Sequence, residues 1–175
     1  MSKKAFLFPG QGVQKCGMGK DFYENSSQAA NLFEKASEAL GLDMKALCFE
    51  ENARLDQTEY TQVALVTTYL AMCRELESRG VTPDITAGLS LGEYAPIAAA
   101  GAMSDLDAIR LVRKRGMLMQ NTVPAGEGAM CAILALDEKK IEEILSEIPD
   151  VTIANYNCPG QIVITGKTAE VERAA

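Results

Sequence analysis

Residues 87–94 read AGLSLGEY, and this stretch decides how the N-terminal part of the chain is interpreted. It contains the Gly-x-Ser-x-Gly pattern of a nucleophile elbow, a sharp turn that carries a reactive serine from a buried strand to a helix. Ser90 is the serine of this pattern, and the backbone N–H of Leu91 could donate to an oxyanion at the start of the helix. A serine that only caps a helix would produce the same pattern, so both interpretations stay open at this point.

The sequence on both sides of the elbow predicts alternating strands and helices. Apolar residues 5–8 end at a Pro-Gly pair and predict a buried strand, and residues 85–88 predict the strand that leads to Ser90. The helices are predicted from apolar residues at helical spacing or from alanine-rich sequence, at 27–40, 44–49, 58–79, 91–100 and 104–121. Such alternation is typical of an α/β domain with a mostly parallel sheet.

The pattern changes after residues 123–128, VPAGEG, which have the composition of a linker. The segments that follow predict the order strand, helix, strand, strand, helix, over 129–136, 137–148, 151–157, 161–165 and 168–175. A ferredoxin-like unit has this order with one more strand at its end. We therefore expect the sequence to be a truncated piece of a longer protein.

The composition argues against several classes of function. The chain has 17 Lys and Arg against 24 Asp and Glu, a net charge of −7, which argues against a nucleic-acid-binding protein. The 5 cysteines are scattered without a CxxC pair and no histidine is present, so we predict reduced thiols in a cytoplasmic protein and no metal site. No apolar run approaches the roughly 20 residues that a membrane-spanning helix needs, so we expect no membrane partner.

The absence of histidine raises a question about Ser90. A neutral serine hydroxyl is a weak nucleophile and usually needs a neighbouring base, most often histidine. Three explanations stay open. Ser90 is not a nucleophile, it uses an unusual base, or its base lies on polypeptide outside this sequence.

Gln11 is a candidate for the second oxyanion donor. It lies between two glycines in the loop after the first predicted strand. Loops at the carboxyl ends of parallel strands meet at one edge of the sheet, where ligands bind, so the Gln11 backbone N–H could lie near Ser90. A simple tight turn would explain the flanking glycines equally well.

Arg115 is a candidate for binding a carboxylate. It stands at the edge of an apolar stripe of Leu111, Leu118 and Met119, and a guanidinium can hold a carboxylate with two hydrogen bonds. An arginine that extends over apolar surface to solvent is the alternative. The same predicted helix carries a basic cluster: Arg110, Arg113 and Lys114. Such a cluster is usually a solvated face, but it could also dock an acidic partner.

Five short segments stand in a specific order along the chain. They are FPGQG at 8–12, TQVAL at 61–65, GLSLGEY at 88–94, RGMLMQ at 115–120 and NCPGQ at 157–161. Together they resemble the malonyl-CoA:acyl carrier protein transacylases, the loading enzymes of bacterial fatty acid synthesis. The resemblance covers the whole chain. It departs at Leu89, where many members have a histidine that is not the catalytic base.

The resemblance implies a role for each candidate residue. Ser90 would attack the malonyl thioester and form an acyl-serine, and the phosphopantetheine thiol of acyl carrier protein would then take the malonyl group. The N–H groups of Gln11 and Leu91 would hold the oxyanion, and Arg115 would grip the malonyl carboxylate and select a diacid. Malonyl-CoA and phosphopantetheine would be substrates, with no permanently bound cofactor.

The resemblance also implies a fold and a missing base. The fold would be α/β, with an incomplete α/β-hydrolase-like domain with a parallel sheet over residues 1–124 and an incomplete ferredoxin-like domain over residues 129–175. The family's catalytic histidine comes from a segment after the small domain, beyond residue 175 of this sequence. We therefore expect these 175 residues alone not to catalyse transfer.

Two other functions are weighed against this one. A patatin-like serine hydrolase uses a Ser-Asp dyad without histidine, but its aspartate comes from an Asp-Gly turn and no Asp-Gly dipeptide occurs here. A non-catalytic fragment could instead dock carrier protein through the face from Arg110 to Arg115. Because carrier proteins and this chain are both acidic, such an attraction would be local and would weaken with added salt.

Overall fold

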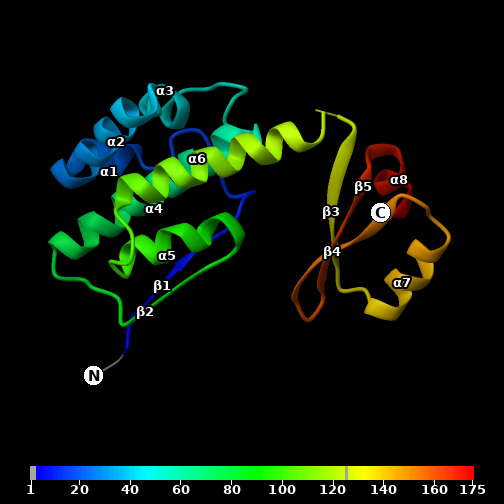
Figure 1. The fold of residues 1–175 in the computed structure, drawn as a ribbon. Helices are drawn as coiled ribbons and strands as arrows, with labels where there is room; N and C mark the ends of the chain where they lie inside the picture. The colour runs from blue at the N-terminus through cyan, green and yellow to red at the C-terminus, as the bar shows by residue number, and fades with distance from the viewer. Residues whose placement is uncertain (1–2, 125) are drawn as a thin grey trace. The chain divides into compact units, whose positions relative to one another are not determined.

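The structure is a computed structural model that describes residues 3–124 and 126–175, and Figure 1 traces the chain. The chain divides into two compact units, Met1–Gln120 and Asn121–Ala175. The elements up to the end of the first unit are β1 (Ala5–Phe8), α1 (Lys20–Asn25), α2 (Ser27–Leu40), α3 (Met44–Phe49), α4 (Thr58–Ser78), β2 (Ile85–Gly88), the 3-10 helix η1 (Ser90–Glu93), α5 (Tyr94–Ala99) and α6 (Asp105–Thr122). Those that follow are β3 (Gly128–Leu134), α7 (Glu138–Ser146), β4 (Val151–Cys158), β5 (Gln161–Lys167) and α8 (Thr168–Ala174). The fold is mixed α/β.

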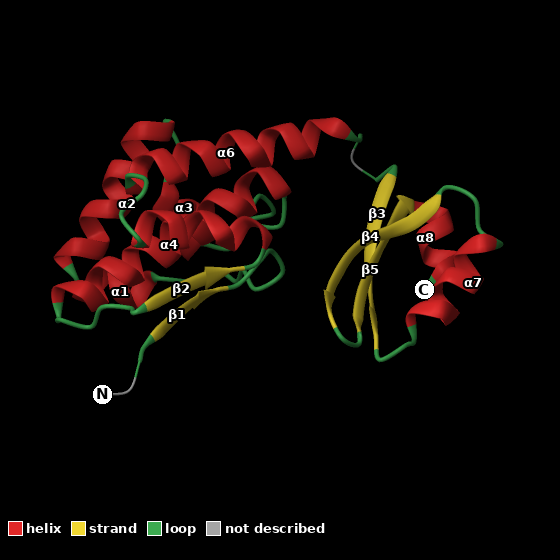
Figure 2. Ribbon diagram, turned by 60° about the horizontal axis from the view of Figure 1, so that its bottom comes forward, coloured by secondary structure: helices red, strands yellow, loops and turns green. Residues whose placement is uncertain are grey.

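The first unit is built on a parallel pair of strands. β1 and β2 pair in register from Ala5 opposite Ile85 to Phe8 opposite Gly88, which confirms the predicted parallel sheet. Figure 2 shows the helices of this unit gathered beside these two strands. Both loops that follow the strands therefore leave the same edge of the sheet, one toward Gln11 and the other directly into Ser90.

Helix α4 forms the centre of the core because apolar side chains surround it on nearly all sides. Val63, Val66 and Leu70 are fully buried, and α4 packs against α2. The predicted bounds of α2 and α3 are confirmed. α1 was missed because its short sequence follows four glycines and buries no residue, so it carries no apolar periodicity.

Arg74 ties three helices of the first unit together. Its guanidinium on α4 donates to both carboxylate oxygens of Asp105 at the start of α6, at 2.9 and 2.6 Å. It also donates to the backbone carbonyl of Ala98 on α5, at 3.0 Å. The hydrogen bonds with Asp105 raise the pKa of Arg74 above its ordinary value, so Arg74 stays charged. This link fixes the two helices that follow the elbow.

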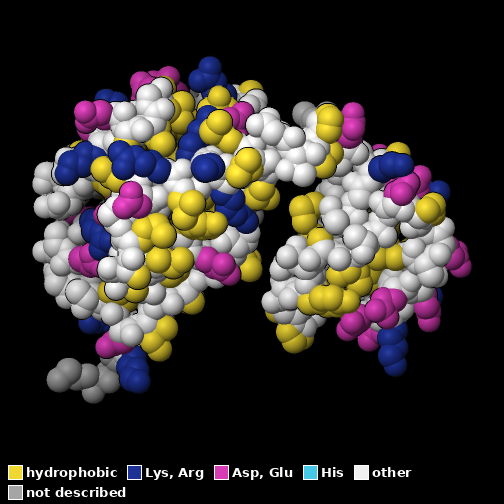
Figure 3. Space-filling model, in the orientation of Figure 1, with side chains coloured by type: hydrophobic (Ala, Val, Ile, Leu, Met, Phe, Trp, Pro, Cys, Tyr) yellow, Lys and Arg dark blue, Asp and Glu magenta, His cyan; other side chains and the backbone are white. Residues whose placement is uncertain are grey.

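Residues 5–8 form the predicted strand, but the prediction that this strand is buried is wrong for one of its faces. Phe8 belongs to the core, but Leu7 on the opposite face is 73% exposed, and Ile85 on β2 is 57% exposed. The helices of the described residues cover only one face of the pair, whereas parallel sheets are usually covered on both faces. Figure 3 shows hydrophobic side chains exposed on the surfaces of both units.

The second unit is a three-stranded antiparallel sheet with two helices. The sheet order is β3-β5-β4. Ile141 on α7 and Val171 on α8 pack against Ile162 and Ile164 of β5. The order of elements is the predicted strand, helix, strand, strand, helix.

The cysteines are free thiols, as predicted. Cys16 and Cys158 are exposed, whereas burial raises the pKa of the Cys48 and Cys73 thiols to about 12. Among the residues with described positions, no helix is long and apolar enough to cross a membrane. Nor does that part of the chain bring together three or more His, Cys, Asp or Glu side chains that could hold a metal ion.

Candidate active site

Ser90 occupies a strained turn directly after β2. Its φ is 54°, a left-handed conformation that residues other than glycine rarely adopt. The residue that caps the following 3-10 helix is Leu89, and the cap has no side-chain hydrogen bond. The interpretation of Ser90 as a simple helix cap is therefore wrong. Backbone strain of this kind is typical of a serine that a tight turn holds above the edge of a sheet.

The two glycines of the pattern, Gly88 and Gly92, are required because other backbone segments lie too close to them for a side chain. A Cβ atom on Gly88 would lie 2.6 Å from the backbone nitrogen of Glu93, and one on Gly92 would lie 2.5 Å from the carbonyl oxygen of Pro9. Both distances are shorter than van der Waals contact allows. The elbow therefore folds tightly on itself and packs against the end of β1, which places Ser90 beside the Gln11 loop.

The two candidate oxyanion donors lie in neighbouring segments. The Leu89 N–H donates to the Phe8 carbonyl at 3.1 Å, which joins the elbow to the end of β1. Leu91 is within the first turn of η1, where backbone N–H groups have no partner inside the helix. The Gln11 side chain donates to Thr58 Oγ1 at 3.2 Å, so its loop is anchored to the start of α4.

Arg115 lies next to Ser90. Its Nη2 donates to Ser90 Oγ at 3.2 Å, and its Nη1 donates to Gln62 Oε1 at 2.6 Å. The guanidinium carbon also lies 5.9 Å from the centre of the Tyr94 ring. The alternative in which Arg115 extends over the surface to solvent is therefore wrong.

The apolar stripe predicted beside Arg115 is not buried. Leu111, Leu118 and Met119 are 43%, 62% and 46% exposed, respectively. The buried face of α6 consists instead of Ala108, Ile109, Val112 and Gly116. A Cβ atom on Gly116 would lie 2.9 Å from the Cα of Glu59, so this glycine lets α6 approach α4 closely. That approach brings Arg115 within reach of Gln62.

Gln62 is the residue that sequence reasoning missed as part of the site. It is 1% exposed, and besides accepting from Arg115 it donates through Nε2 to Met119 Sδ at 3.3 Å. The available signal was an amide side chain in a helix segment whose next four residues, Val-Ala-Leu-Val, are apolar. A buried amide of this kind needs partners, and periodicity does not identify them.

The predicted basic cluster does not present three free cations. Arg113 pairs with Glu59 at 3.0 Å, donates to the Glu59 carbonyl at 2.6 Å and stacks over Tyr60 at 4.6 Å. Arg110 lies 3.7 Å from Asp107 and, like Lys114, is exposed. The charge of Arg113 is therefore balanced within the fold, and only the other two cations face solvent.

The described residues supply no base for Ser90. Within residues 3–124 and 126–175, the structure shows no hydrogen bond donated by Ser90 Oγ, which only accepts from Arg115. The Arg115 hydrogen bond leaves the hydroxyl proton free to point elsewhere. The arrangement therefore places a serine hydroxyl next to a cation, and a base that could activate this hydroxyl is not among the described residues.

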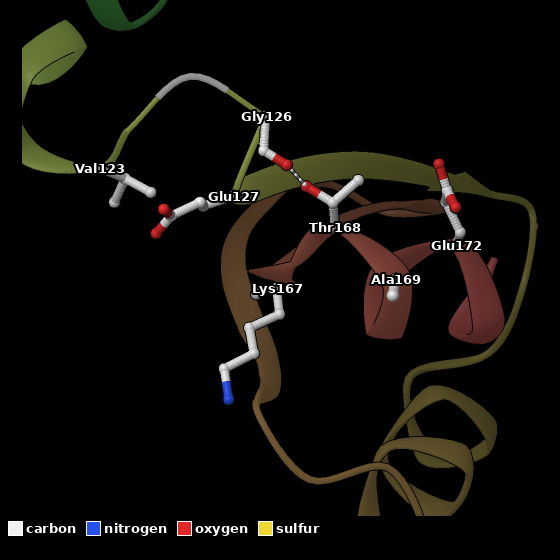
Figure 4. A pocket seen from close by; sticks show the side chains of 9 residues that line it. Val123, Gly126, Glu127, Lys167, Thr168, Ala169 and Glu172 are labelled. Atoms are coloured by element: carbon white, nitrogen blue, oxygen red, sulfur yellow. Dashed lines mark hydrogen bonds between the residues drawn. The ribbon is translucent and has the colours of Figure 1, made fainter.

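A pocket in the second unit contains none of the predicted site residues. Figure 4 shows its lining at the start of β3 and of α8, including Glu127, Lys167 and Glu172. The Thr168 hydroxyl donates to the Gly126 carbonyl at 2.7 Å, a bond that joins the two segments. None of the residues proposed for chemistry at the elbow lines this pocket.

Comparisons with known proteins agree with the geometry of the elbow. A family model described as acyl transferase domain matches residues 5–175. A malonyl CoA-acyl carrier protein transacylase of Bacillus subtilis is 49% identical over 100% of this chain and 57% of its own length. One of Staphylococcus aureus is 43% identical over 98% of this chain and 57% of its own length. The chain thus spans just over half the length of these curated relatives.

Solved structures show the same similarity. A malonyl CoA-acyl carrier protein transacylase of Clostridium perfringens has a TM-score of 0.88 and 44% identity, over 99% of this chain and 56% of that one. A malonyl-transacylase in complex with its type II PKS acyl-carrier protein has a TM-score of 0.90 and 40% identity, over 99% of this chain and 58% of that one.

Proposed function

The chain belongs to the acyl transferase domain family, and from this premise we propose that Ser90 is the nucleophile of a malonyl-CoA:acyl carrier protein transacylase. The observation that carries the proposal is the contact between Ser90 Oγ and Arg115 Nη2, at 3.2 Å. It joins a serine in a strained elbow to a cation suited to a carboxylate. A malonyl thioester has both an electrophilic carbonyl and a carboxylate. The similarity to malonyl CoA-acyl carrier protein transacylases does not favour the alternative of a Ser-Asp hydrolase.

The proposed reaction has two half-reactions at Ser90. Its oxygen bonds to the malonyl carbonyl carbon, the carbon–sulfur bond to CoA breaks, and the hydroxyl proton passes through a general base to the CoA thiolate. In the second half-reaction the phosphopantetheine thiol of acyl carrier protein loses its proton to the base and attacks the ester. The Ser90–malonyl bond then breaks and Ser90 recovers a proton. Because the chain contains no histidine, we propose that the base lies on polypeptide outside these 175 residues.

The backbone N–H groups of Gln11 and Leu91 are proposed as the oxyanion donors. Gln11 follows β1 and Leu91 follows the elbow, and the Leu89–Phe8 hydrogen bond keeps these segments together. Each donor of this type contributes on the order of 3 kcal/mol to the stability of the transition state. Their contribution depends on backbone position, so substitution of the Gln11 side chain alone would leave the donor in place.

Two further proposals concern organisation and partner. We propose that residues 1–124 belong to an α/β-hydrolase-like domain and residues 129–175 to a ferredoxin-like domain, acting in the cytoplasm without a resident cofactor. The partner would be acyl carrier protein, which the malonyl-transacylase of the solved complex binds. The exposed Arg110 and Lys114 could contact such an acidic partner, whereas Arg113 is paired with Glu59.

The proposal is tested by the intact mass of the native-length protein before and after brief mixing with malonyl-CoA. A gain of one malonyl group, located on the peptide that contains Ser90, is the expected result. A polypeptide limited to these 175 residues is expected to gain nothing, because it contains no histidine. A native-length protein that stays unmodified, or is modified on another residue, would overturn the proposed function.

Arg115→Ala is expected to change acyl selectivity. The loss of charge-assisted hydrogen bonds to the malonyl carboxylate should lower kcat/KM for malonyl-CoA by about 100-fold. Acylation by acetyl-CoA, which has no carboxylate, should change by much less. The measurement is the rate of Ser90 acylation with each thioester.

Arg110→Ala is the matched control for Arg115→Ala, because Arg110 lies on the same helix and is exposed. It should leave both acylation rates from CoA thioesters unchanged. An equal decrease for malonyl-CoA and acetyl-CoA in Arg115→Ala would contradict a role in carboxylate recognition.

A further inference from the structure

We infer that Gln62 is a positioning residue, which orients the Arg115 guanidinium toward the substrate carboxylate without neutralising its charge. This inference rests on the proposed function of Arg115. The two residues come from different helices, α4 and α6, and are linked by the 2.6 Å hydrogen bond from Arg115 Nη1 to Gln62 Oε1.

The environment of Gln62 fixes the orientation of its amide. The side chain is 1% exposed, and a buried amide is costly unless its donor and acceptor are both satisfied. Its oxygen accepts from Arg115, and its nitrogen donates to the thioether of Met119, four residues further along α6. A thioether is only a weak acceptor, and a guanidinium can only donate. The amide oxygen must therefore face Arg115.

A second arginine on the same helix provides an internal comparison. Arg113 lies two residues before Arg115, and its partner Glu59 lies three residues before Gln62 on α4. The Glu59 carboxylate lies 3.0 Å from Arg113 and forms an ion pair with it, so the positive charge of Arg113 is balanced within the fold. The partner of Arg115 is the neutral amide of Gln62. Arg115 is thus anchored by a hydrogen bond while its positive charge remains available.

The remaining contacts of Arg115 leave one side of the guanidinium for a ligand. Nη1 is held by Gln62, and Nη2 contacts Ser90 Oγ, the atom that would carry the malonyl group. The Tyr94 ring lies 5.9 Å away. With Nη1 fixed, the direction of the remaining N–H groups is set. A carboxylate attached to the acyl group on Ser90 would meet donors that are already oriented.

The test compares Gln62→Glu and Gln62→Met in the native-length protein. Gln62→Glu would place a carboxylate against Arg115 and should lower the malonyl-to-acetyl ratio of kcat/KM about 30-fold. Gln62→Met keeps the side-chain length but removes the acceptor, and should lower the ratio about tenfold. In the Arg115→Ala background neither substitution should change the ratio further.

Glu59→Gln is the matched control, because it changes one charge on the same helix next to Arg113. It should leave the malonyl-to-acetyl ratio unchanged. If both Gln62 variants lower the two rates by the same factor, or leave the ratio unchanged, the inference is wrong and Gln62 only fills space. If the unsubstituted protein is not acylated, or Arg115→Ala keeps its selectivity, the proposed function itself fails.

Discussion

Replacing Ser90 by alanine is expected to abolish malonyl transfer, with a loss in kcat on the order of 10⁵-fold. Removal of a serine nucleophile has effects of this size because the other groups of the site then have no covalent intermediate to stabilise. Alanine has the same Cβ atom as serine, so the strain at φ 54° remains the same in both proteins. The free energy of unfolding should therefore stay close to that of the unsubstituted protein, and the loss should be chemical.

The measurement for Ser90→Ala is the rate of malonyl transfer to acyl carrier protein by the native-length protein, together with its thermal unfolding. Ser146→Ala is a suitable control. That serine is exposed on α7, and its hydroxyl only donates to the Glu143 carbonyl at 2.6 Å. It should retain full activity. A Ser90→Ala protein that keeps more than about a tenth of the rate would rule out Ser90 as the nucleophile.

Gly92→Ala is expected to destabilise the protein by about 4 kcal/mol, at the upper end of overpacking effects. The added methyl group would lie 2.5 Å from the carbonyl oxygen of Pro9 and also inside contact distance of Phe8. These are backbone atoms at the end of β1, so they cannot move aside as a flexible side chain would. Relief of the clash must separate the elbow from β1, which also displaces the proposed oxyanion donors.

The control for Gly92→Ala is Gly41→Ala. Gly41 caps the end of α2 with φ 59°, and a Cβ atom there would meet nothing within 4 Å. This substitution should cost only about 1 kcal/mol, the usual cost of a left-handed conformation for a residue with a Cβ atom. The comparison is made by chemical unfolding of the native-length protein. Equal losses for the two variants would contradict the close packing of the elbow on β1.

Helices and strands could be predicted from the sequence where the spacing of apolar residues within the segment itself identifies them. The apolar periodicity of α2 and α4 and the short apolar strands β1 and β2 were recognised within one residue of their bounds. The turn at Ser90 was also predictable, because the glycines on both sides of it serve a local backbone requirement. α1 was not, since six residues with no buried side chain leave no pattern.

The surface of the sheet and the face of α6 could not be predicted in the same way. Leu7 is apolar and exposed, because exposure depends on which other segments cover the strand. On α6 the apolar residues beside Arg115 predicted a buried stripe, yet the helix packs through its small residues around Gly116. A single helix carries several possible apolar faces, and the partner helix selects one of them.

The sequence by itself determined the candidate nucleophile and its family, since both depend on short segments that can be recognised in order. Only the tertiary structure decided that Arg115, and not Arg113, keeps an available charge. That difference arises because α4 presents Gln62 to one arginine and Glu59 to the other, 53 and 54 residues away along the chain. The pairing depends on the distance and rotation between two helices, which packing at Gly116 fixes and the periodicity of either helix alone does not contain.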